Sequence, residues 1–311
     1  ASIIIPCFNE DEQVRETIRY ALQTQYPNFE VIAVNDGSSD QTAAILDELA
    51  VNNERLRVVH LANNQGKAFA LRSGAMVSQH EHLICIDGDA LLHPHAVLWM
   101  MHHLINFGHV GAVTGNPRII NRSSILGKLQ VGEFSSIIGL IKRAQRTYGR
   151  IFTVSGVIAG FRKTALEEVG FWSADKITED IDISWKIQIQ NWKIHYVPHA
   201  LCYIYMPETF GGLWKQRVRW AQGGVEVLKT YLPKMFHFKM LGMWPVAVEC
   251  VLSVLWSYVV LLIVVLFLTG FFIDYPTSWQ IKSLMPQWYG VILAITCLIQ
   301  FFISLWIDKR Y

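Results

Sequence analysis

Short apolar runs alternate with longer amphipathic stretches along the first two thirds of the chain. The apolar runs are rich in Val and Ile, and they read SIIIP, EVIAVND, LRVVHL, HLICID and VGAVTG. The stretches between them have helix-like apolar spacing and predict helices at residues 11–25, 40–51, 67–78 and 95–107. This alternation predicts βαβ units and a mostly parallel sheet, an α/β fold. Ligands of such sheets bind at the carboxyl ends of the strands, so polar residues there are candidates for a site.

The middle of the chain predicts a long helix followed by a more irregular region. Residues 118–150 have an amphipathic pattern with a basic cluster at Lys142, Arg143, Arg146 and Arg150. The segment FTVSGVIAGFRK then predicts a hairpin-like pair of strands, residues 178–190 predict a helix, and KIHYVP predicts one more strand.

The pattern changes again after residue 207. In the region 208–240, apolar residues recur with spacings of four and three, at Trp214, Val218, Ala221, Val225 and Leu228. Basic residues and Trp lie beside this stripe, which favours a helix in a membrane interface. An ordinary helix that faces a protein core gives the same spacing, and the pattern alone leaves both interpretations open.

Two hydrophobic spans follow within residues 241–311. Residues 244–273 and 288–307 are each long enough to cross a bilayer. The first span has one charge, Glu249 near its start, whose insertion at mid-membrane would cost about 2.5–3.5 kcal/mol against about −0.3 to −0.6 kcal/mol for each Leu, Ile, Val or Phe. Lys234 and Lys239 precede the first span, Lys309 and Arg310 follow the second, and the connection contains only Lys282. The positive-inside rule therefore predicts that both outer flanks, and with them the α/β domain, are cytoplasmic.

Composition excludes few functions but agrees with a membrane location. The 311 residues are 52% hydrophobic with a net charge of +2, which gives no basis for a nucleic-acid partner. The five cysteines lack the spacing of a zinc site or a disulfide framework, which fits a reducing compartment. The chain starts at ASIIIP, within a predicted strand, and ends abruptly at WIDKRY, so we expect a fragment that lacks flanking terminal parts.

Acidic residues follow two predicted strands and begin one predicted helix. VIAVNDGSSD ends a strand with Asp36, and LICIDGDALLHP ends another with Asp87 and Asp89. An Asp-x-Asp pair at the end of a buried strand suits Mg²⁺ or Mn²⁺, which is held by one or two carboxylates and leaves other positions to substrate phosphates. Each motif alone is also an ordinary turn, but together on one βαβ frame they indicate a nucleotide-diphosphate site.

The stretch ITEDIDISWKI brings Glu179, Asp180 and Asp182 within four residues at the start of a helix. Acidic side chains in a first turn complement the helix dipole, and Thr178 is placed to be the N-cap. Alternatively, one of the carboxylates is a general base that faces a cleft. Asp182, two residues after Asp180, is expected to point elsewhere.

Two basic segments fit a nucleotide sugar. Lys67 begins a helix after a strand, where it is placed to neutralise a phosphate with help from the helix N-terminus. QRVRW puts Gln216 and Trp220 on one face of a helix, with two arginines nearby; arginine binds pyrophosphate bidentately and an indole face carries a sugar ring. The alternatives are a solvated lysine and a membrane anchor.

Five segments together resemble the processive family-2 glycosyltransferases, which include cellulose, chitin and hyaluronan synthases. The segments IPCFNE, VNDGSSD, DGD, TED and QRVRW occur in this order ahead of the two spans. The resemblance covers essentially the whole chain, and within the family it is to the synthases of the biofilm polysaccharide poly-β-1,6-N-acetyl-D-glucosamine. One departure is Asn35, where many members carry a second aspartate, so the uridine role would fall to Asp36 alone.

The resemblance implies a division of the chain and a location. A GT-A catalytic domain would cover residues 1–207, an interfacial helix region 208–240, and two transmembrane helices 241–311. The protein would be a multi-pass protein of the bacterial inner membrane with a cytoplasmic catalytic domain. A small second membrane subunit and control by cyclic di-GMP are implied as well, although no residue of this chain indicates either.

The resemblance also implies roles for individual residues. The uridine pocket would be lined by Pro6, Asn9, Glu10 and Asp36. Asp87 and Asp89 would flank the Mg²⁺ or Mn²⁺ ion and the diphosphate, with Asp89 the direct ligand, while Lys67 faces the diphosphate. Asp180 would be the general base and Glu179 a supporting residue. The residues that close over the diphosphate and the acceptor end would be Gln216, Arg217, Arg219 and Trp220.

The implied reaction is an inverting, processive transfer from a UDP-sugar, here UDP-N-acetylglucosamine, to a growing polysaccharide that leaves through the membrane helices. Chitin-, hyaluronan- or cellulose-type synthesis is the nearest alternative. A single-transfer enzyme that glycosylates a polyprenyl phosphate usually lacks QRxRW, and a non-catalytic nucleotide receptor need not keep Asp180 together with the DGD pair. A Rossmann dehydrogenase is disfavoured because no GxGxxG follows the first strand.

Overall fold

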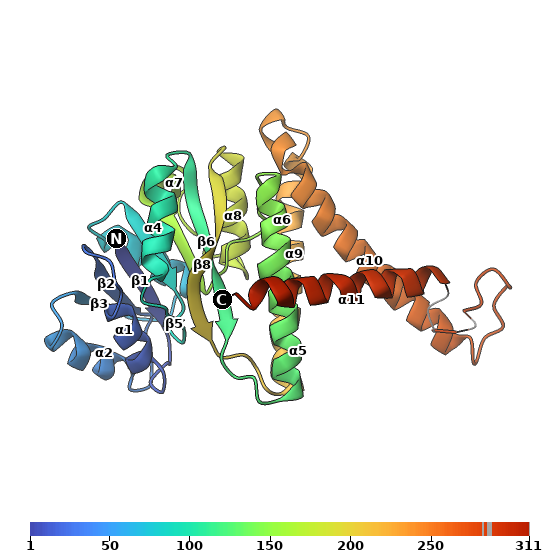
Figure 1. Ribbon diagram of the computed structural model, residues 1–311, viewed down its shortest axis with the longest axis horizontal. Helices are drawn as coiled ribbons and strands as arrows, with labels where there is room; N and C mark the ends of the chain where they lie inside the picture. The colour runs from blue at the N-terminus through green and yellow to red at the C-terminus, as the bar shows by residue number, and fades with distance from the viewer. Residues whose placement is uncertain (282, 285–287, 311) are drawn as a thin grey trace.

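The computed structural model describes residues 1–281, 283–284 and 288–310. The described chain contains an eight-stranded sheet in the order β3-β2-β1-β4-β7-β6-β8-β5, with helices on both sides (Figure 1). The strands are β1 (Ser2–Cys7), β2 (Glu30–Asn35), β3 (Leu56–His60), β4 (His82–Ile86), β5 (Leu91–Leu92), β6 (Val110–Ile119), β7 (Ile158–Arg162) and β8 (Lys193–Ile204). The strands predicted from the apolar runs are confirmed; the two-residue β5 is additional.

Pairing within the sheet is mixed but mostly parallel. Strands β1 to β4 pair in parallel, and β6 pairs in parallel with β8. Strand β7 lies between these two groups and runs antiparallel to both β4 and β6. The two parallel groups are buried on both faces, which explains their continuous runs of Val and Ile.

The predicted hairpin around β7 is wrong. Before β7 there is a single bridge, between Ser155 and Ile158, rather than a second strand. Backbone N–H groups just before it donate to side chains instead of to a strand: Phe152 N donates to Gln145 Oε1 at 3.0 Å, and Val154 N donates to Ser184 Oγ at 2.8 Å. Side chains from neighbouring helices therefore replace the ladder that an apolar pattern alone predicts.

Helices cover the two faces of the sheet and bury separate cores. One face packs against α1 (Val14–Leu22), α2 (Thr42–Val51) and α4 (Ala96–Asn106). The other packs against α3 (Lys67–Val77), α7 (Lys163–Glu168) and α8 (Glu179–Ile189). Helices α1 to α4 and α8 confirm the periodicity predictions to within a few residues, whereas the short α7 was not predicted.

The long helix predicted at 118–150 begins later and contains an irregular turn. Residues up to Ile119 belong to β6, and the helical run consists of α5 (Ile125–Phe134), a π-helical segment η1 (Ser135–Ile141) and α6 (Lys142–Thr147). A π-helical turn has one extra residue per hydrogen-bonded ring, so the side chains before and after it point in different directions around the helix axis. Such turns are frequent at functional sites.

A third apolar cluster joins the sheet domain to the C-terminal helices. Helix α9 (Phe210–Tyr231) covers α8 through Trp185, Val227 and Tyr231, which pack with residues from the short η2 (Leu232–Lys234) and η3 (Phe238–Met243) region and from α10 (Trp244–Thr269). The indole of Trp185 is fully buried and stacks on the Tyr231 ring at 5.5 Å. The C-terminal helices are therefore attached to the α/β domain through a packed core.

Helices α10 and α11 (Trp288–Asp308) are long and apolar enough to cross a membrane, and most of their apolar side chains are exposed. Helix α10 ends at Thr269, four residues before the predicted end of the first span at residue 273. Figure 1 shows both helices extending from the α/β domain, with the end of α11 returning to it. There Arg118 pairs with Asp308 at 2.5 Å, and Ser136 bonds to Ser304 at 3.0 Å. Lys282, which enters the topology prediction, lies outside the described residues.

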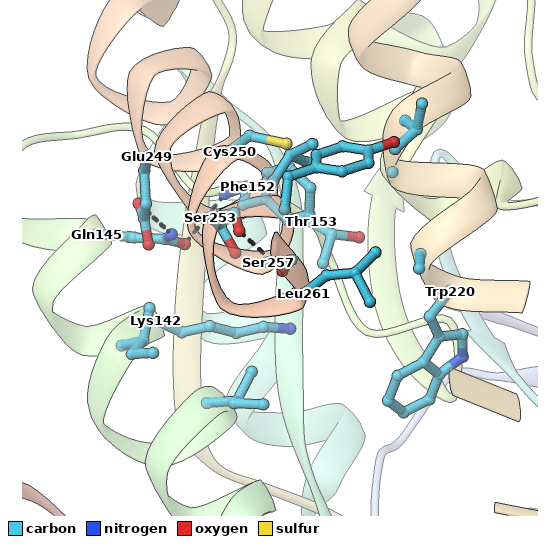
Figure 2. Close-up of a pocket in the computed structure, with 17 residues that line it drawn as sticks. Lys142, Gln145, Phe152, Thr153, Trp220, Glu249, Cys250, Ser253, Ser257 and Leu261 are labelled. Atoms are coloured by element: carbon cyan, nitrogen blue, oxygen red, sulfur yellow. Dashed lines mark hydrogen bonds between the residues drawn. The ribbon is translucent and has the colours of Figure 1, made fainter. Parts of the chain in front are cut away.

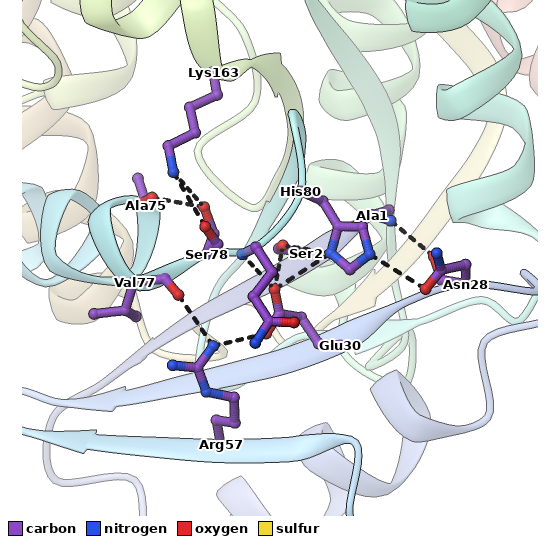
Figure 3. Close-up of polar contacts among 11 residues, drawn as sticks. Ala1, Ser2, Asn28, Glu30, Arg57, Ala75, Val77, Ser78, His80 and Lys163 are labelled. Atoms are coloured by element: carbon purple, nitrogen blue, oxygen red, sulfur yellow. Dashed lines mark hydrogen bonds and ion pairs between the residues drawn. The ribbon is translucent and has the colours of Figure 1, made fainter.

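A polar cluster fixes the amino ends of β1 and β2, far from the strand ends that matter for binding (Figure 3). Glu30 accepts from Ser2 Oγ at 2.7 Å, from Gln79 N at 2.8 Å and from Arg57 at 3.0 Å, and it also contacts His80. Although burial favours the neutral acid, these hydrogen bonds hold the pKa of Glu30 below its usual value. Each acceptor position of this carboxylate is used structurally, so the cluster stabilises the fold.

Candidate active site

Three loops that follow β1, β2 and β4 come together because β1 lies between β2 and β4 in the sheet. They carry Glu10, Asp36 and Asp87, respectively. The contact between the loops is close: a Cβ added to Gly88 would lie 2.9 Å from the carbonyl oxygen of Pro6 and 3.3 Å from Glu10. The structure therefore gathers the acidic motifs at one edge, as the strand-end prediction requires.

Asp36 and Asn9 hold the loops in place through their own hydrogen bonds. Asp36 is 2% exposed, and its two carboxylate oxygens accept from Gln65 N at 2.9 Å and from Gly66 N at 2.8 Å. Asn9 adopts a positive φ of 55° and accepts from Ser39 N at 2.9 Å. Asp36 thereby fixes the backbone just before α3 and sets the position from which the next residue, Lys67, projects.

The Asn35 side chain, whose role the sequence left open, has a structural function. Its amide oxygen accepts from Ser38 N at 3.1 Å, and its amide nitrogen lies 3.1 Å from His60 Nδ1. Asn35 thus supports the turn after β2. The Gly37 in this turn has φ +67°, and a Cβ there would lie 2.6 Å from the backbone of Asn63 and Asn64, so the turn requires glycine.

Lys67 lies at the centre of the acidic residues. Its Nζ is 2.6 Å from Asp87 Oδ1 and 3.1 Å from Glu179 Oε1, and it donates to the carbonyl of Gly156 at 3.2 Å. Burial opposes its charge, but Asp87 and Glu179 outweigh this effect and raise the pKa of Lys67. The same lysine, despite the burial of Glu179, holds the pKa of that carboxyl below its usual range. Residues from α3, β4 and α8 are joined here by one permanent positive charge.

Glu10 and Asp89, in contrast to Glu179, have raised pKa values. Burial, together with the nearby Asp89, Asp87 and Asp40, raises the pKa of Glu10 to about 7. Burial and Asp87 also raise the pKa of Asp89. A concentration of negative charge with too few cations has this effect, because each carboxylate opposes the ionisation of the next. The edge of the sheet beside Lys67 is therefore a strong cation-attracting region.

Asp180 faces the same cluster from the first turn of α8. Burial first, and then the adjacent Glu179, raise the pKa of Asp180. A Cβ added to Gly156 would lie 3.1 Å from Asp180 Oδ2 and 3.3 Å from Lys67 Nζ, so any larger residue would separate the two groups. Asp180 Oδ1 accepts only from the N–H of the next residue, Ile181, at 2.9 Å among the described residues. A half-buried carboxylate with a raised pKa and an open oxygen has the properties of a general base.

The other residues of ITEDIDISWKI have structural roles. Asp182 accepts from Tyr231 at 2.9 Å and from Ser173 at 2.7 Å, so it points away from Asp180 as predicted and ties α8 to α9. Thr178 occupies the N-cap position, but the expected cap hydrogen bond is wrong, because its hydroxyl bonds to none of the described residues. Instead Thr178 packs on α9, where a Cβ on Gly223 would lie 2.1 Å from its Oγ1. The threonine therefore determines how closely α9 approaches the site.

The QRVRW residues lie on α9 at the border of the acidic cluster. Arg219 is close enough to Glu179 to lower the pKa of that carboxyl. Arg217 pairs with Glu133 of α5 at 2.5 Å, and its guanidinium lies over the Trp220 ring at 4.4 Å. Gln216 lies next to Met206. The structure thus brings Arg219 near the cluster, while Arg217 joins α9 to α5 and orients Trp220.

A pocket of about 510 Å³ lies between η1, α6, α9 and the part of α10 from Glu249 to Leu261 (Figure 2). Its wall is mostly apolar, and Trp220 forms one side of it. Polar groups on the wall are Lys142, Gln145, Thr153, Glu249, Ser253 and Ser257. The part of the predicted α9 stripe at Ala221 and Val225 faces this pocket, whereas Trp214 is 64% exposed.

Comparison with known families decides the identity of the domain. Residues 1–223 match the family described as "Glycosyltransferase like family 2". The chain belongs to glycosyltransferase family 2. It is therefore a hexosyltransferase with a GT-A-like fold, as the sequence motifs indicate.

Relatives within family 2 extend over the entire chain. The chain is 42% identical over 311 residues to the poly-β-1,6-N-acetyl-D-glucosamine synthase of Staphylococcus epidermidis, with 100% of this chain and 75% of the relative covered. It is 40% identical over 310 residues to the enzyme of that name from Staphylococcus aureus strain COL, with the same coverage.

Two solved structures share the fold at low identity. A mannosyltransferase from Pyrobaculum calidifontis, in complex with GDP-Man and Mn²⁺, superimposes with a TM-score of 0.64 at 19% identity over 99% of this chain and 85% of that chain. The S. aureus protein TarS (residues 1–349), in complex with UDP-GlcNAc, gives a TM-score of 0.53 at 18% identity over 73% of this chain and 66% of that chain. These similarities support the GT-A fold.

Several residues that shape this family-2 site carry no motif and were not assigned from the sequence. Gly223 permits a close approach of α9 to Thr178 that only the packed structure defines. Lys142 was noted as one of a basic cluster, yet it is 4% exposed and lies on the pocket wall. The one signal of its burial in the sequence is its position directly after the apolar run SSIIGLI.

Proposed function

We propose that this chain is a membrane-bound, processive, inverting glycosyltransferase that polymerises β-1,6-linked N-acetylglucosamine from UDP-N-acetylglucosamine. The observation that carries the proposal is the arrangement around Lys67. A cation-attracting edge with Asp87 and Asp89 lies on one side of it, and a base candidate, Asp180, lies on the other. The pocket lined by Lys142 and Trp220, which reaches α10, provides space for an acceptor chain. The synthases at 42% and 40% identity support the choice of sugar and linkage.

Asp180 is the group that we assign to proton transfer. A sugar hydroxyl is a weak nucleophile until its proton is removed, and a carboxylate with a raised pKa accepts such a proton more readily. Attack by that hydroxyl on the anomeric carbon, with departure of UDP from the opposite face, inverts the configuration. An α-linked donor then gives a β-linked product, and the proton of the acceptor hydroxyl is on Asp180 at the end of the step.

The acidic edge suits a hard divalent cation. Asp87 and Asp89 offer carboxylate oxygens, and their mutual repulsion would be relieved by a cation. Within the described residues, no group of three His, Cys, Asp or Glu side chains could enclose a metal, so the diphosphate would complete the coordination, as Mg²⁺ commonly requires. The residues present therefore fit Mg²⁺ or Mn²⁺, with Asp89 as the direct ligand and Asp87 beside it. When bound, the ion would neutralise the charge that develops on the leaving diphosphate.

The donor and acceptor contacts follow from the positions of the loops and of α9. We assign the uridine pocket to the loops after β1 and β2, with contributions from Pro6, Asn9, Glu10 and Asp36. Asp36 acts through the backbone that it holds, since both of its oxygens are occupied. Lys67 and Arg219 would face the diphosphate, Trp220 would carry the acceptor sugar, and Gln216 and Arg217 would hold the helix that presents them. Glu179 supports the site by keeping Lys67 in place.

The membrane arrangement rests on where the two apolar helices meet the catalytic domain. Met243 at the end of η3 and Val246 at the start of α10 belong to the same apolar cluster as α8, and the end of α11 is fixed to Arg118 through Asp308. Both outer ends are therefore on the side of the catalytic domain. We propose a domain at 1–207, an interfacial region at 208–240 and a two-span membrane region at 241–311. The domain would face the cytoplasm of the bacterial inner membrane, as the positive-inside rule predicts.

Thiol labelling tests this topology. In a variant with Cys297→Ser, we expect an impermeant maleimide added to intact spheroplasts to label Asp274→Cys, in the connection between the helices. It should not label Asn52→Cys, at the exposed end of α2. Labelling of Asn52→Cys from outside would reverse the orientation.

Product analysis tests the reaction. Membranes that contain the protein are incubated with single UDP-sugars, and the polymer is digested with linkage-specific glycosidases. We expect polymer only from UDP-N-acetylglucosamine, resistant to chitinase and cleaved by an enzyme specific for β-1,6-linked N-acetylglucosamine. A chitinase-sensitive polymer, a cellulose- or hyaluronan-type product, or a single sugar on a polyprenyl phosphate would each replace the proposal.

A further inference from the structure

Lys142 is a buried lysine whose charge has little compensation from the protein. Its side chain is 4% exposed, and among the described residues its Nζ makes one hydrogen bond, to Thr114 Oγ1 at 3.3 Å. An ammonium group has three N–H donors, so two remain for another partner. Figure 2 shows the side chain extending from α6 along the wall of the pocket, with its amine toward the pocket interior and Trp220 on the far side. Burial of a charge in this way is costly unless a partner is present.

The surroundings of Lys142 connect it to the catalytic centre. Thr114 Oγ1 also accepts from Ser155 N at 2.8 Å, and the next residue, Gly156, is the one that lies against Asp180. Burial lowers the pKa of Lys142 to about 8, against the attraction of Asp180. At neutral pH the group is still mainly cationic. Lys142 therefore lies on the pocket wall and close enough to Asp180 for the two charges to interact.

Glu249 is a second charge on the same wall. In the second turn of α10, its Oε2 accepts from Gln145 at 3.0 Å and from Tyr148 at 3.1 Å. Gln145 is itself held by Phe152 N, which donates to its Oε1 at 3.0 Å. Gln145 is three residues from Lys142 on the same helix, and no ion pair joins Lys142 to Glu249 in the part of the chain that the structure describes. The fold therefore holds a cation and an anion in one mostly apolar pocket without letting them neutralise each other.

We propose that Lys142 and Glu249 are acceptor-binding residues, which recognise the hydroxyl and amide groups of the saccharide that receives each new sugar. Lys142 donates to an oxygen of the sugar nearest Asp180, and Glu249 accepts from a hydroxyl of a sugar nearer the membrane. An uncharged polyhydroxylated ligand offers hydrogen-bond partners to both groups at once, whereas a lipid tail offers a hydrogen bond to neither. The inference rests on the proposed function, because it takes the occupant of the pocket to be the polysaccharide acceptor.

Kinetics with an added acceptor test the role of Lys142. The full chain in detergent is assayed with UDP-N-acetylglucosamine and N-acetylglucosamine oligosaccharides. Loss of a charged hydrogen bond should raise the acceptor KM of Lys142→Met about tenfold or more. The donor KM and the slow hydrolysis of donor by water should stay within about twofold of the parent, because neither uses the acceptor. Glu249→Gln should give a smaller rise of the acceptor KM. Lys128→Met, at an exposed position on α5, should leave the acceptor KM, the donor KM and donor hydrolysis unchanged.

The native Cys250 offers a test that leaves both charges intact. It lines the pocket, while Cys7, Cys85 and Cys202 are buried and Cys297 can be replaced by Ser. In the Cys297→Ser protein, we expect the oligosaccharides to slow alkylation of Cys250 by a maleimide. Alkylation should in turn stop polymer formation while UDP still binds. Protection by added phospholipid but not by saccharide would overturn the proposal in favour of a lipid occupant.

The two proposals fail in different ways. If the parent protein makes no polymer from UDP-N-acetylglucosamine, the proposed function is wrong. If the parent makes polymer but Lys142→Met has the parent's acceptor KM, only the present inference is wrong. Binding of UDP shows that each variant is folded, and Lys142→Arg, which keeps the charge, provides a second variant if Lys142→Met does not fold. A fall of donor hydrolysis in parallel with transfer would instead assign Lys142 to the support of Asp180, and would overturn the acceptor role.

Discussion

The Lys67 ammonium lies 2.6 Å from Asp87 Oδ1, at the edge of the sheet where β4 ends. The same nitrogen is 3.1 Å from Glu179 on α8, more than a hundred residues away in the sequence. One lysine thus joins the candidate metal edge to the helix that carries the candidate base, and Gly156 leaves the space that this arrangement needs.

Asp180 and Asp182 allow a base and a structural carboxylate to be compared within one helical turn. Asp180→Asn cannot accept a proton, so turnover should fall at least about a hundredfold while UDP binding with Mg²⁺ is kept. Asp182→Asn disturbs the bonds to Tyr231 and Ser173, so it should lower stability by about 1–3 kcal/mol yet retain turnover per folded molecule. The turnover of Glu179→Gln should lie between the turnover of these two variants. Turnover of Asp180→Asn within tenfold of the parent would remove the base assignment.

Removal of divalent cations should stop transfer. With Asp87 and Asp89 as donors and the diphosphate completing the coordination, EDTA should abolish activity, and Mg²⁺ or Mn²⁺ should restore it. Asp89→Asn should need a higher Mg²⁺ concentration for half-maximal turnover, measured by UDP release. Asp47→Asn, an exposed carboxylate on α2, is the matched control. Full activity in excess chelator would eliminate the metal from the reaction.

Gly223 sets the distance between α9 and the active site. A Cβ there would lie 2.1 Å from Thr178 Oγ1, so Gly223→Ala should destabilise the protein by about 1–3 kcal/mol and reduce polymer synthesis. Combining it with Thr178→Gly should restore much of the loss, because glycine is tolerated at an N-cap. Gly211→Ala, with nothing near its Cβ on the same helix, should be harmless. The measurements are the unfolding temperature and the rate of polymer formation; an inert Gly223→Ala variant would contradict the packing argument.

The paired histidines His103 and His195 should make stability depend on pH. Their ring nitrogens are 3.1 Å apart, and burial and the charge of Arg146 lower both pKa values to about 4. In the unfolded chain, histidine titrates near pH 6.5, so between these values the unfolded state binds more protons. The stabilisation is therefore complete above about pH 6.5 and is lost as the pH falls toward 4. The unfolding temperature in detergent should fall from pH 7.5 to pH 5, and His195→Gln should show a shallower fall.

Much of the fold was predictable because it depends on local patterns. The alternation of Val- and Ile-rich runs with amphipathic stretches identified β1, β2, β3, β4 and β6 and the four helices between them. Strand pairing was less accessible, because the antiparallel β7 and the side-chain bonds before it involve residues distant in sequence. Phe152 N, for example, donates to Gln145, and its apolar neighbours gave no sign of this.

The sequence by itself determined which chemical groups this protein has at its strand ends and at the start of α8, and that its C-terminal part is apolar enough for a membrane. Residue type and short spacing carry that information, and Asp36, Asp87, Asp89 and Asp180 are the result. The tertiary structure alone decided which of these groups face one another. The ion pairs of Lys67, the approach of Gly223 to Thr178 and the burial of Lys142 all depend on elements packing across the sheet. Distances between such elements are set by the summed packing of the core, which no single stretch of sequence contains.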